Sequence, residues 1–599
     1  MNPDTEPAAK DSPAANDAAR RGFLPRFPQN LTINLLAITV GVATAFGTAL
    51  FILMMRWCRY LFFDVVQPEL VPFLGSASIV FIPVLGGLLM GPIVTYISPE
   101  ARGSGVPQLM MAIDRIKGRV RARVIFSKIV ATVLTLSSGG SAGREGPIIQ
   151  IGGSIGAFVA RIFAITPGRT RWLIASGCAA GIAVLFDTPI AGAIFAMEVI
   201  VGDYAIRSFA SIILASVAGS VVGYYVLGPS PSFLIPSYKP LVWHEYGFFL
   251  ALGLLAAISS LLFVKLLYAT ESAFTRVRIP LWIKPAIGGL GVGVIAMWAP
   301  QIMDTGYEFM NQMLKQEFVV SNLVMALVVL LVLKIVATSL TVGSGGSGGV
   351  FAPSVFIGGT LGAAIGNLAN RALDTPFQNP GAYALVGMAA MLGATIQAPF
   401  TAIIMIVEMT NDYSLVMPLM LAVAVATLVY NHYLRYSAFT LKLHQLGMRR
   451  RAFHDVNVLE EIQVGEIMHR EIDTLHEDTP YDEAYHIVFS SHHNGFPVMD
   501  RDGLLVGIIT EGDFGKHLIT DRERAHQVKL KEIMCTHVKT VYADTLVWEV
   551  HKLFDKLRLG RFPVVSRDNP RKIIGIVTRS DIVHAYPLAL KRHETEFEI

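Results

Sequence analysis

A single carboxylate stands in a long apolar region of the chain. Glu145 lies within "GGSAGREGPIIQIGG", beside Arg144, between glycines and two residues before Pro147. A proline in the first turn of a helix loses no intrahelical hydrogen bond, and glycine lets the backbone approach a ligand closely. The segment therefore predicts the start of a helix whose free N–H groups and positive dipole end form an anion site. The alternative is that Glu145 only stabilises the first turn of its own helix.

The same segment occurs twice in the chain. "KIVATVLTLSSGGSAGREGPIIQIGGSIGA" begins at Lys128 and "KIVATSLTVGSGGSGGVFAPSVFIGGTLGA" begins at Lys334, with 18 of 30 positions identical. Phe351 stands in the second copy where Glu145 stands in the first. Proteins that move ions through two related halves place the ion site between half-helices near the bilayer midplane. The chain is predicted to have two such halves, and their symmetry is broken at Glu145.

Other charged residues of the repeats have less specific meanings. Glu198 and Glu408 share a repeat position, which favours a structural role near helix ends. Lys128, Lys334 and Arg144 either extend toward the membrane surface or set a positive potential along the entry path of an anion.

The composition is that of a membrane protein. The 599 residues are 53% hydrophobic and 16% charged, with a mean hydropathy of +0.52, which is beyond the balance of a soluble domain. Some apolar runs are long enough to span a bilayer, and others are shorter or cut by glycine and proline, which is typical of broken or re-entrant helices. The long runs are 31–55, 211–228, 248–264 and 414–433.

Positive charges flank the apolar region. Arg20, Arg21 and Arg26 precede the first run, and basic residues recur at 115–123 and 449–451. By the positive-inside rule these flanks are cytosolic, so both termini are expected in the cytoplasm and the protein in the inner (cell) membrane. The net charge of +4 gathers at these flanks, so nucleic acid is not an expected partner.

A second duplication follows residue 436. Charges become frequent there, and short β-branched runs alternate with helical ones, as in a soluble α/β region. "VGEIMHREIDTL" (464–475) corresponds to "LKEIMCTHVKTV" (530–541), and Phe496 corresponds to Phe562. The sequence therefore predicts a paired α/β module after the membrane region.

Together these motifs resemble the CLC chloride channels and transporters, in a bacterial type with a C-terminal pair of CBS domains. The resemblance covers roughly 31–586 and rests on "GSGVP" (103–107), "GREGP" (143–147) and "GGVFAP" (348–353), followed by Tyr436. It implies an all-α polytopic membrane domain of two inverted-topology repeats, with broken and re-entrant helices, followed by a cytosolic α/β CBS-domain pair. It also implies a homodimer in the lipid bilayer, with one pore per subunit and interface helices near 189–199 and 399–409.

The resemblance implies a chloride site as well. Partial charges from N–H and O–H donors hold this weakly hydrated anion without trapping it. By resemblance, the hydroxyls of Ser104 and Tyr436 and the amides of Val350 and Phe351 bind chloride, and Glu145 is the gate that competes with it. Taken alone, Ser104 also fits a helix cap and Tyr436 an interfacial tyrosine. The motif residues that shape the site are Gly103, Gly105, Pro107, Gly143, Arg144, Gly146, Pro147, Gly349 and Pro353.

Proton coupling is the question that the motifs leave open. Proton-coupled members of the family carry two adjacent glutamates where this chain reads "FAMEVIVGD". The first matches Glu198, and the proton-transfer position falls on Val199, which cannot carry a proton. This departure favours a passive gated chloride channel, with chloride/proton exchange as the alternative.

The paired module resembles CBS domains that bind adenine nucleotides. In "GIITEGD" and "GIVTRSD", Asp513 and Asp581 are placed to accept from ribose hydroxyls, and Thr510 and Thr578 to bond a phosphate. The alternative is that the threonines are N-caps of the helices that follow. No cofactor is otherwise expected.

An enzyme is not expected. An intramembrane metalloprotease requires H-E-x-x-H, and "HEYGF" at His244 lacks the second histidine. A divalent-cation site needs clustered carboxylates, whereas the motifs here present serine, glycine and backbone donors. Cys58, Cys178 and Cys535 are far apart and show no metal spacing, so no metal site is predicted.

The predicted domain map divides the chain into six segments. These are a cytosolic tail (1–28), the membrane domain (29–445, with repeats at about 31–228 and 245–435), a linker (446–463), two CBS domains (464–520 and 530–586) and a C-terminal tail (587–599).

Overall fold

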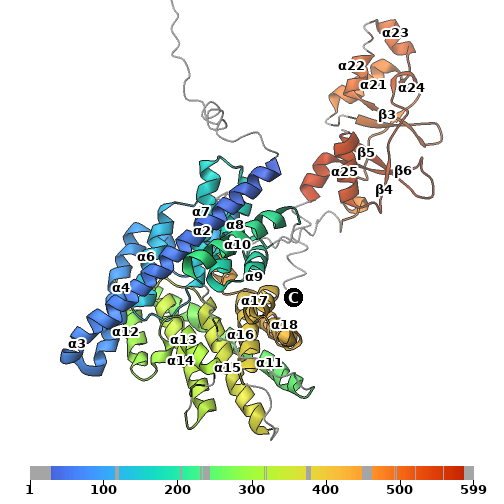
Figure 1. Cartoon of the computed structure of the whole chain (residues 1–599). Coiled ribbons are helices and arrows are strands. Elements are labelled where there is room, and N and C mark those ends of the chain that lie inside the picture. The colour runs from blue at the N-terminus through green and yellow to red at the C-terminus, as the bar shows by residue number, and fades with distance from the viewer. Residues whose placement is uncertain are drawn as a thin grey trace, which may run out of the picture. The chain divides into compact units, whose positions relative to one another are not determined.

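A computed structural model divides the chain into two compact units, Met1–Arg451 and Ala452–Ile599. Figure 1 shows both units, and each is described here by itself. The predicted tails, 1–28 and 587–599, and most of the predicted linker lie outside the described residues. The structure describes 29–585 except 115–119, 203–205, 229–232, 234–242, 316, 319, 373–379, 448–461, 492, 494, 518, 520 and 558.

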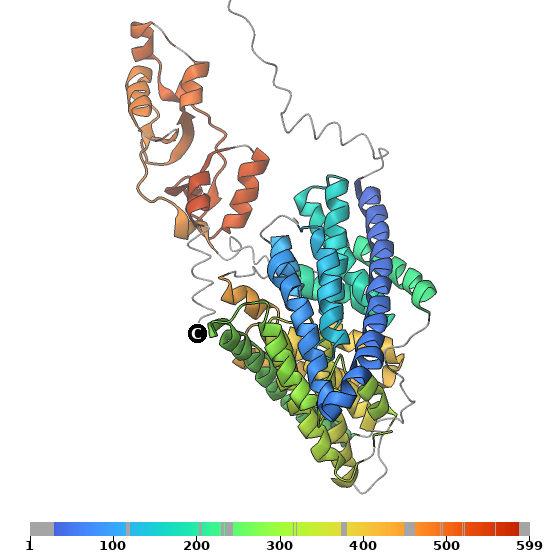
Figure 2. The same ribbon diagram turned by 90° about the vertical axis from the view of Figure 1, so that its left-hand side faces the viewer.

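The first unit is a bundle of helices. In both views the helices of the first half (blue to cyan) and those of the second half (green to yellow) gather in different parts of the bundle (Figures 1 and 2). The first half contains α2 (Gln29–Tyr60), α3 (Gln67–Leu74), α4 (Ser78–Pro92), α5 (Val106–Asp114), α6 (Arg123–Ser137), α7 (Glu145–Ile162), α8 (Pro167–Phe186), α9 (Pro189–Phe195) and α10 (Ile206–Leu227). The second half contains α11 (Glu245–Arg276), α12 (Lys284–Ala296), α13 (Tyr307–Leu314), α14 (Leu323–Gly343), α15 (Phe351–Ala372), α16 (Pro380–Ile396), α17 (Pro399–Thr410), α18 (Val416–Tyr433) and α19 (Thr440–Gln445).

Long and short helices are mixed, as the apolar runs predict. Among the described residues, six helical stretches are long and apolar enough to cross a membrane. Several others, such as α9 and α17, are too short to cross and begin at a proline. Short helices at membrane depth are tolerated where protein covers their ends. The six long stretches are 31–97, 209–227, 245–276, 323–343, 351–371 and 413–433.

The two halves bond to each other through a reciprocal exchange. The Ser141 N–H donates to the Thr341 hydroxyl (3.0 Å), and the Ser347 N–H donates to the Thr135 hydroxyl (3.3 Å). Ser347 and Thr341 are the repeat equivalents of Ser141 and Thr135. In each half, a threonine hydroxyl therefore accepts a hydrogen bond from the equivalent buried serine N–H of the other half. A two-fold axis between the repeats requires this reciprocal bonding.

Equivalent helix pairs also pack in the same way. A Cβ atom added to Gly152 of α7 would collide with the backbone of Gly177 on α8, and one added to Gly358 of α15 would collide with Gly387 on α16. Small residues let membrane helices approach until their backbones touch. The tight pairs α7–α8 and α15–α16 therefore hold the half-helices that begin at Glu145 and Phe351.

The second unit contains two similar three-stranded sheets. In each sheet the first strand runs parallel to the second, and the second runs antiparallel to the third. The first copy contains α20 (Val464–Ile467), β1 (Leu475–His476), α21 (Tyr481–Ser490), β2 (Gly495–Met499), β3 (Leu505–Thr510), α22 (Glu511–Lys516) and α23 (Arg522–Gln527). The second contains α24 (Leu530–Ile533), β4 (Val541–Tyr542), α25 (Val547–Leu557), β5 (Arg561–Val565) and β6 (Ile573–Thr578).

The leading segment of each copy packs on the sheet of the other copy. Val464 of α20 belongs to the same core cluster as Phe562 on β5, and Leu530 of α24 belongs to that of Phe496 on β2. The His469 N–H donates to the Ile576 carbonyl of β6 (3.0 Å). The two copies therefore exchange their first helices, and each core is completed by the other copy.

Candidate functional site

Two half-helices meet at the centre of the first unit. The Gly143 N–H donates to the Gly349 carbonyl and the Gly349 N–H donates to the Gly143 carbonyl, both at 2.7 Å. These glycines lie two residues before the starts of α7 and α15. The reciprocal bridge thus brings the N-termini of both helices together, where their free N–H groups and positive dipole ends favour an anion.

Glu145 places a carboxylate on the opposite half-helix. The residue is fully buried at the start of α7. Its Oε2 accepts a hydrogen bond from the Ala352 N–H of α15 (3.2 Å), and its Oε1 accepts one from the Tyr307 hydroxyl (2.6 Å). The carboxylate oxygens therefore occupy a position that suits a free anion. The amide that they use is one residue beyond the predicted donors, Val350 and Phe351.

The Ser104 loop reaches the same place. The Gly103 N–H donates to the Gly346 carbonyl (3.0 Å), and Gly103 has a φ of +68°. A Cβ atom added to Gly146 would lie 2.8 Å from the Ser104 carbonyl oxygen and 3.2 Å from the Gly349 Cα. Ser104, the first turn of α7 and the "GGVFAP" segment therefore converge, and the convergence depends on glycine at 146.

The remaining motif residues lie at helix starts or in tight turns. Gly105 has a φ of +85°, in the left-handed region that favours glycine. Pro107, Pro147 and Pro353 fall in the first turns of α5, α7 and α15, where a proline costs no intrahelical hydrogen bond.

Tyr436 lies after α18, on the segment that leads into α19. Its ring stacks on His444 of α19 at a centroid distance of 4.3 Å, and its carbonyl accepts from the Tyr430 hydroxyl (3.0 Å). Because α19 packs against α5, Tyr436 belongs to the neighbourhood of the helix that follows Ser104. Its chloride-binding role stays a prediction.

The two repeat lysines are completely buried. Lys128 Nζ donates to the carbonyls of Ala101 (3.0 Å) and Gly103 (2.6 Å). Lys334 Nζ donates to those of Ile302 and Asp304, both at 2.9 Å. Neither side chain extends to a membrane surface. Each lysine instead anchors the loop that precedes a short helix, α5 in the first half and α13 in the second.

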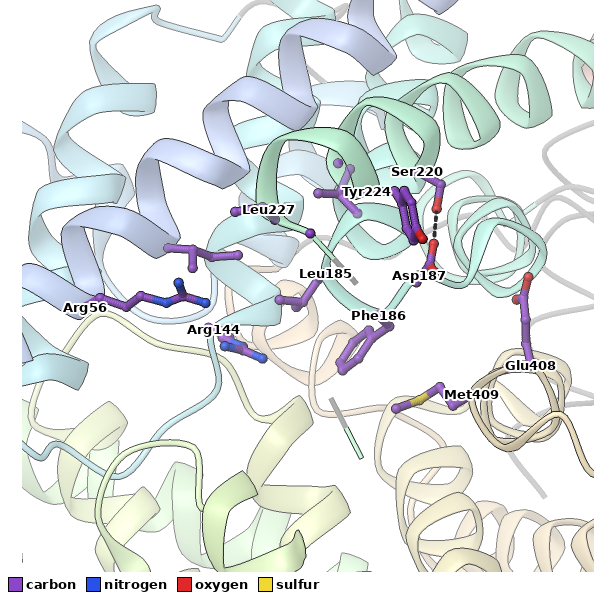
Figure 3. A pocket seen from close by; sticks show the side chains of 14 residues that line it. Arg56, Arg144, Leu185, Phe186, Asp187, Ser220, Tyr224, Leu227, Glu408 and Met409 are labelled. Carbon is purple, nitrogen blue, oxygen red and sulfur yellow. Dashed lines mark hydrogen bonds between the residues drawn. The ribbon is translucent and has the colours of Figure 1, made fainter. Parts of the chain in front are cut away.

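Arg144 lines a cavity of about 210 Å³ beside the half-helix junction. Figure 3 shows that Arg56 and Arg144 approach this cavity from one side and that Asp187, Ser220 and Tyr224 lie across it. The cavity is also lined by Glu408, so two arginines and two carboxylates, Asp187 and Glu408, face it.

The predicted proton-transfer position is occupied by Val199, which has no titratable group. It is buried within the π-helical turn Ala196–Val201. The neighbouring Glu198 accepts hydrogen bonds from the Thr401 N–H (2.8 Å), the Thr401 hydroxyl (2.6 Å) and the Phe400 N–H (3.2 Å). Glu198 therefore stabilises the N-terminus of α17, in line with the structural role that its repeat position favours.

Glu408 performs the reciprocal task for the first half. Its carboxylate accepts from the Ile190 N–H (2.9 Å) and the Ala191 N–H (2.8 Å) at the start of α9. Each repeat therefore lends a carboxylate to a helix N-terminus of the other repeat.

The four predicted nucleotide residues bond in pairs in the second unit. The Thr510 hydroxyl donates to Asp513 (2.7 Å), and the Thr578 hydroxyl donates to Asp581 (2.9 Å). The backbone N–H of each threonine donates to the same carboxylate. These contacts are those of helix N-capping, and the nucleotide role stays a prediction.

Two functional candidates escaped the sequence motifs. Tyr307 lies outside the repeated segments, between Gly306 and Glu308, and no sequence pattern marks it. Ala352 lies inside "GGVFAP", and the repeat itself could have suggested it, because Phe351 is the equivalent of Glu145 and the next N–H is still free in the first helical turn.

The fold and the site together define an anion-transport protein of the membrane. The family described as "Voltage gated chloride channel" matches residues 86–431, and two CBS domains match at 464–519 and 530–588. The first match covers more than half of the chain. The chain therefore belongs to the CLC family, with a tandem pair of CBS domains, and the predicted family is confirmed.

Relatives span most of the chain. It is 31% identical over 431 residues to the "H(+)/Cl(-) exchange transporter ClcA" of Vibrio parahaemolyticus, covering 69% of this chain and 89% of the relative. It is 29% identical over 570 residues to the "Chloride channel protein CLC-f" of Arabidopsis thaliana, covering 83% and 72%. A solved "slow cyanobacterial Cl-/H+ antiporter" is 26% identical with a TM-score of 0.62, covering 70% of this chain and 99% of that one. The predicted fold class is confirmed.

These findings overturn the preference for passive conduction. The exchange transporter and the antiporter both match over most of their own length, so the prediction of a passive channel is wrong. It depended on Val199 alone. One apolar residue removes one possible proton carrier from a route, and it does not decide whether protons reach Glu145 by another path.

Proposed function

We propose that the chain exchanges chloride for protons across a membrane, with Glu145 as both the gate and the proton-carrying group. The names of an exchange transporter and an antiporter among its relatives support this function. An ionised Glu145 occupies the anion site, and a protonated Glu145 leaves it to chloride. Proton binding and chloride binding are thereby linked through one carboxylate.

A single observation carries the proposal. The Glu145 carboxylate accepts the N–H of Ala352, at the N-terminus of the opposite half-helix, while it is fully excluded from solvent. A carboxylate on these donors competes directly with any anion that needs them. Chloride can bind the amides of Val350 and Phe351 and the hydroxyls of Ser104 and Tyr436 only when the Glu145 carboxylate has left the half-helix junction.

Proton movement in liposomes tests the function. Under an inward chloride gradient, the parent protein should drive protons out against their own gradient. Glu145→Gln removes the titratable carboxylate and keeps the shape, so it should abolish proton movement while chloride flux continues and loses its pH dependence. Chloride and proton fluxes are recorded simultaneously with a chloride electrode and a pH electrode.

Glu245→Gln is the matched control. Glu245 is another fully buried carboxylate that accepts from a tyrosine hydroxyl, that of Tyr383 (3.1 Å), outside the half-helix junction. The control should keep uphill proton movement. Chloride flux without proton movement in the parent protein, or coupled proton movement in Glu145→Gln, would refute the proposal.

We propose that the protein assembles as a homodimer in the inner membrane, with the CBS pair and both termini on the cytoplasmic side. Large apolar side chains on the predicted interface helices support this, since Ile190 of α9 and Phe400 of α17 are more than half exposed in one subunit. Cysteine cross-linking at Ile190 in native membranes should give a covalent dimer if these helices meet a second copy.

We also propose that the CBS pair binds an adenine nucleotide through Thr510, Asp513, Thr578 and Asp581. The matched CBS domains support this proposal, as does the equivalent placement of the four residues, since Thr510 and Thr578 end β3 and β6 and each aspartate follows three residues later. Calorimetric titration with ATP, in the parent and in Asp513→Ala, tests it.

A further inference from the structure

Tyr307 contacts Glu145, although the sequence did not predict it as a residue of the site. It begins α13 and is buried, and its hydroxyl donates the 2.6 Å hydrogen bond to Glu145 Oε1. This contact joins residues that are far apart in the chain, and it is shorter than the 3.2 Å bond from the Ala352 N–H. Hydrogen bonds to charged acceptors are about twice as strong as neutral ones. An ionised Glu145 has to break this bond before it can leave the anion site.

The loop before Tyr307 mirrors the loop before α5. Gly103 and Gly105 have φ values of +68° and +85°, and Asp304 and Gly306 have values of +53° and +83°. The lysine at the same repeat position anchors each loop by two carbonyls, Lys128 in the first half and Lys334 in the second. Each repeat therefore delivers one loop and one short helix to the junction in the same way.

The mirrored loops deliver different side chains. The first loop carries Ser104, which is predicted to bind chloride, and the second ends at Tyr307. The second loop is also fixed from outside, because Arg59 pairs with the Asp304 carboxylate at 3.2 Å. A loop held at both its carbonyls and its side chain can place a hydroxyl accurately, which a positioning role requires.

Aromatic rings hold Tyr307 in this orientation. Phe233 contacts the Tyr307 ring edge-on at a centroid distance of 5.1 Å, and Phe186 does so at 6.3 Å. Phe186 also stacks on Phe351 at 5.7 Å, and the Arg144 guanidinium lies 5.2 Å from the centre of the Tyr307 ring. The ring is therefore packed on several sides, and its hydroxyl points at Glu145.

We propose that Tyr307 is a positioning residue of the exchange reaction, whose hydroxyl holds the Glu145 carboxylate in the anion site and so limits the rate at which the site opens to chloride. The inference depends on the proposed role of Glu145 as the gate. It goes further, because it assigns the rate of opening to a residue outside the anion motifs.

Several charged groups surround this pair. Arg144 and Lys334 interact electrostatically with Glu145, and Asp304 interacts with both Tyr307 and Lys334. Arg144 and Lys334 are left in place when only the Tyr307 hydroxyl is removed. A change in the pH profile of Tyr307→Phe therefore reports the lost hydrogen bond and not a lost charge.

Chloride efflux from liposomes that contain the full-length protein tests the proposal. Tyr307→Phe keeps the packed ring and removes the bond, so efflux should be about tenfold faster. Its pH profile should shift, because the ionised carboxylate is held less firmly than in the parent. Efflux in the double variant with Glu145→Gln should be within about twofold of that of Glu145→Gln alone, since no ionised carboxylate remains to be held.

A second variant changes the bond in the opposite sense. Difluorotyrosine at position 307 has a more acidic hydroxyl and nearly the same shape, so it should hold Glu145 more firmly and slow efflux. Tyr383→Phe is the matched control, because it removes a tyrosine bond to the buried Glu245 elsewhere in the same unit. That control should leave efflux and its pH profile unchanged.

The outcomes separate this inference from the proposed function. An unchanged rate and pH profile in Tyr307→Phe, or the same acceleration with and without Glu145, overturns the role of Tyr307. If Tyr307→Phe does not fold, an unchanged or faster rate with difluorotyrosine overturns it. If Glu145→Gln alone keeps coupled proton movement, the proposed function fails regardless of Tyr307.

Discussion

The two membrane repeats share a backbone and differ in the side chains that reach the anion site. Gly143 and Gly349 bridge the two half-helices with equal bonds, and the helices begin at equivalent residues, Glu145 and Phe351. The symmetric part creates two positive helix ends at one point. The asymmetric part provides one carboxylate that can occupy this point. The proposed anion site thus arises from the duplication, and the proposed gate arises from the difference between the copies.

The same division holds for the loops that precede α5 and α13. Lys128 and Lys334 anchor these loops identically, yet one loop carries Ser104 and the other ends at Tyr307. In the proposed mechanism the first repeat therefore offers groups to chloride, and the second offers a group to the Glu145 gate. Two further sets of variants can break or sharpen this comparison, and a third makes the corresponding comparison within the CBS pair.

The largest effect is expected from the buried lysines. Lys334→Met removes the lysine donor from the buried carbonyls of Ile302 and Asp304 and should cost roughly 2–4 kcal/mol of stability. Lys128→Met should cost less, because the carbonyls of Ala101 and Gly103 also accept from the Ser347 hydroxyl and the Gly348 N–H. If the loops have separate tasks, Lys128→Met should weaken chloride binding, and Lys334→Met should alter the pH dependence of chloride flux through Tyr307. Thermal unfolding, chloride calorimetry and efflux against pH measure these effects. Identical functional defects in both variants would contradict the division of tasks.

A smaller effect is expected where the repeats lend carboxylates to each other. Glu198→Gln and Glu408→Gln weaken the capping of α17 and α9, and each should cost about 1 kcal/mol of stability. The loss should be larger for Glu198, which accepts three hydrogen bonds, whereas Glu408 accepts two. The ratio of protons to chloride should not change in either variant. A changed ratio in Glu198→Gln alone would mean that this carboxylate carries protons beside Val199.

The sequence could predict the symmetric part of the site because duplication makes it visible. The repeated "SGGS" segments and the prolines at 147 and 353 mark two helix starts, and the single exchange of Glu145 for Phe351 marks the proposed gate. Ala352 and Tyr307 were missed for different reasons. The donor to a carboxylate depends on a side-chain rotamer, and Tyr307 lies outside both repeated segments, so its contact with Glu145 exists only in the folded chain.

The CBS pair shows a similar limit. The repeats at 464–475 and 530–541 predict two equal domains, but each leading helix packs on the sheet of the other copy. Identical patterns fit either sheet equally well, so the pattern cannot choose between them. The path of the chain decides between them, because the short connection at 468–474 pairs His469 with Ile576 on β6.

The smallest effect is expected from a comparison within the CBS pair. Asp478 and its equivalent Asp544 each pair with an arginine, Arg501 in the first copy and Arg567 in the second. Lys529 and Lys531 at the start of the second copy also bond Asp478, and together with Arg501 they lower the pKa of Asp478. Arg567 lowers the pKa of Asp544.

Asp478→Asn should therefore destabilise the CBS pair more than Asp544→Asn at neutral pH. A lowered folded pKa gives stability that is fully present above the unfolded carboxyl pKa of about 3.9, and this stability is lost as the pH falls through the folded value. Unfolding temperatures of the Ala452–Ile599 unit should differ between the variants at neutral pH and converge in strong acid. Equal losses at neutral pH would show that the two lysines add nothing to the arginine, and that the second duplication, unlike the first, has kept its copies equivalent.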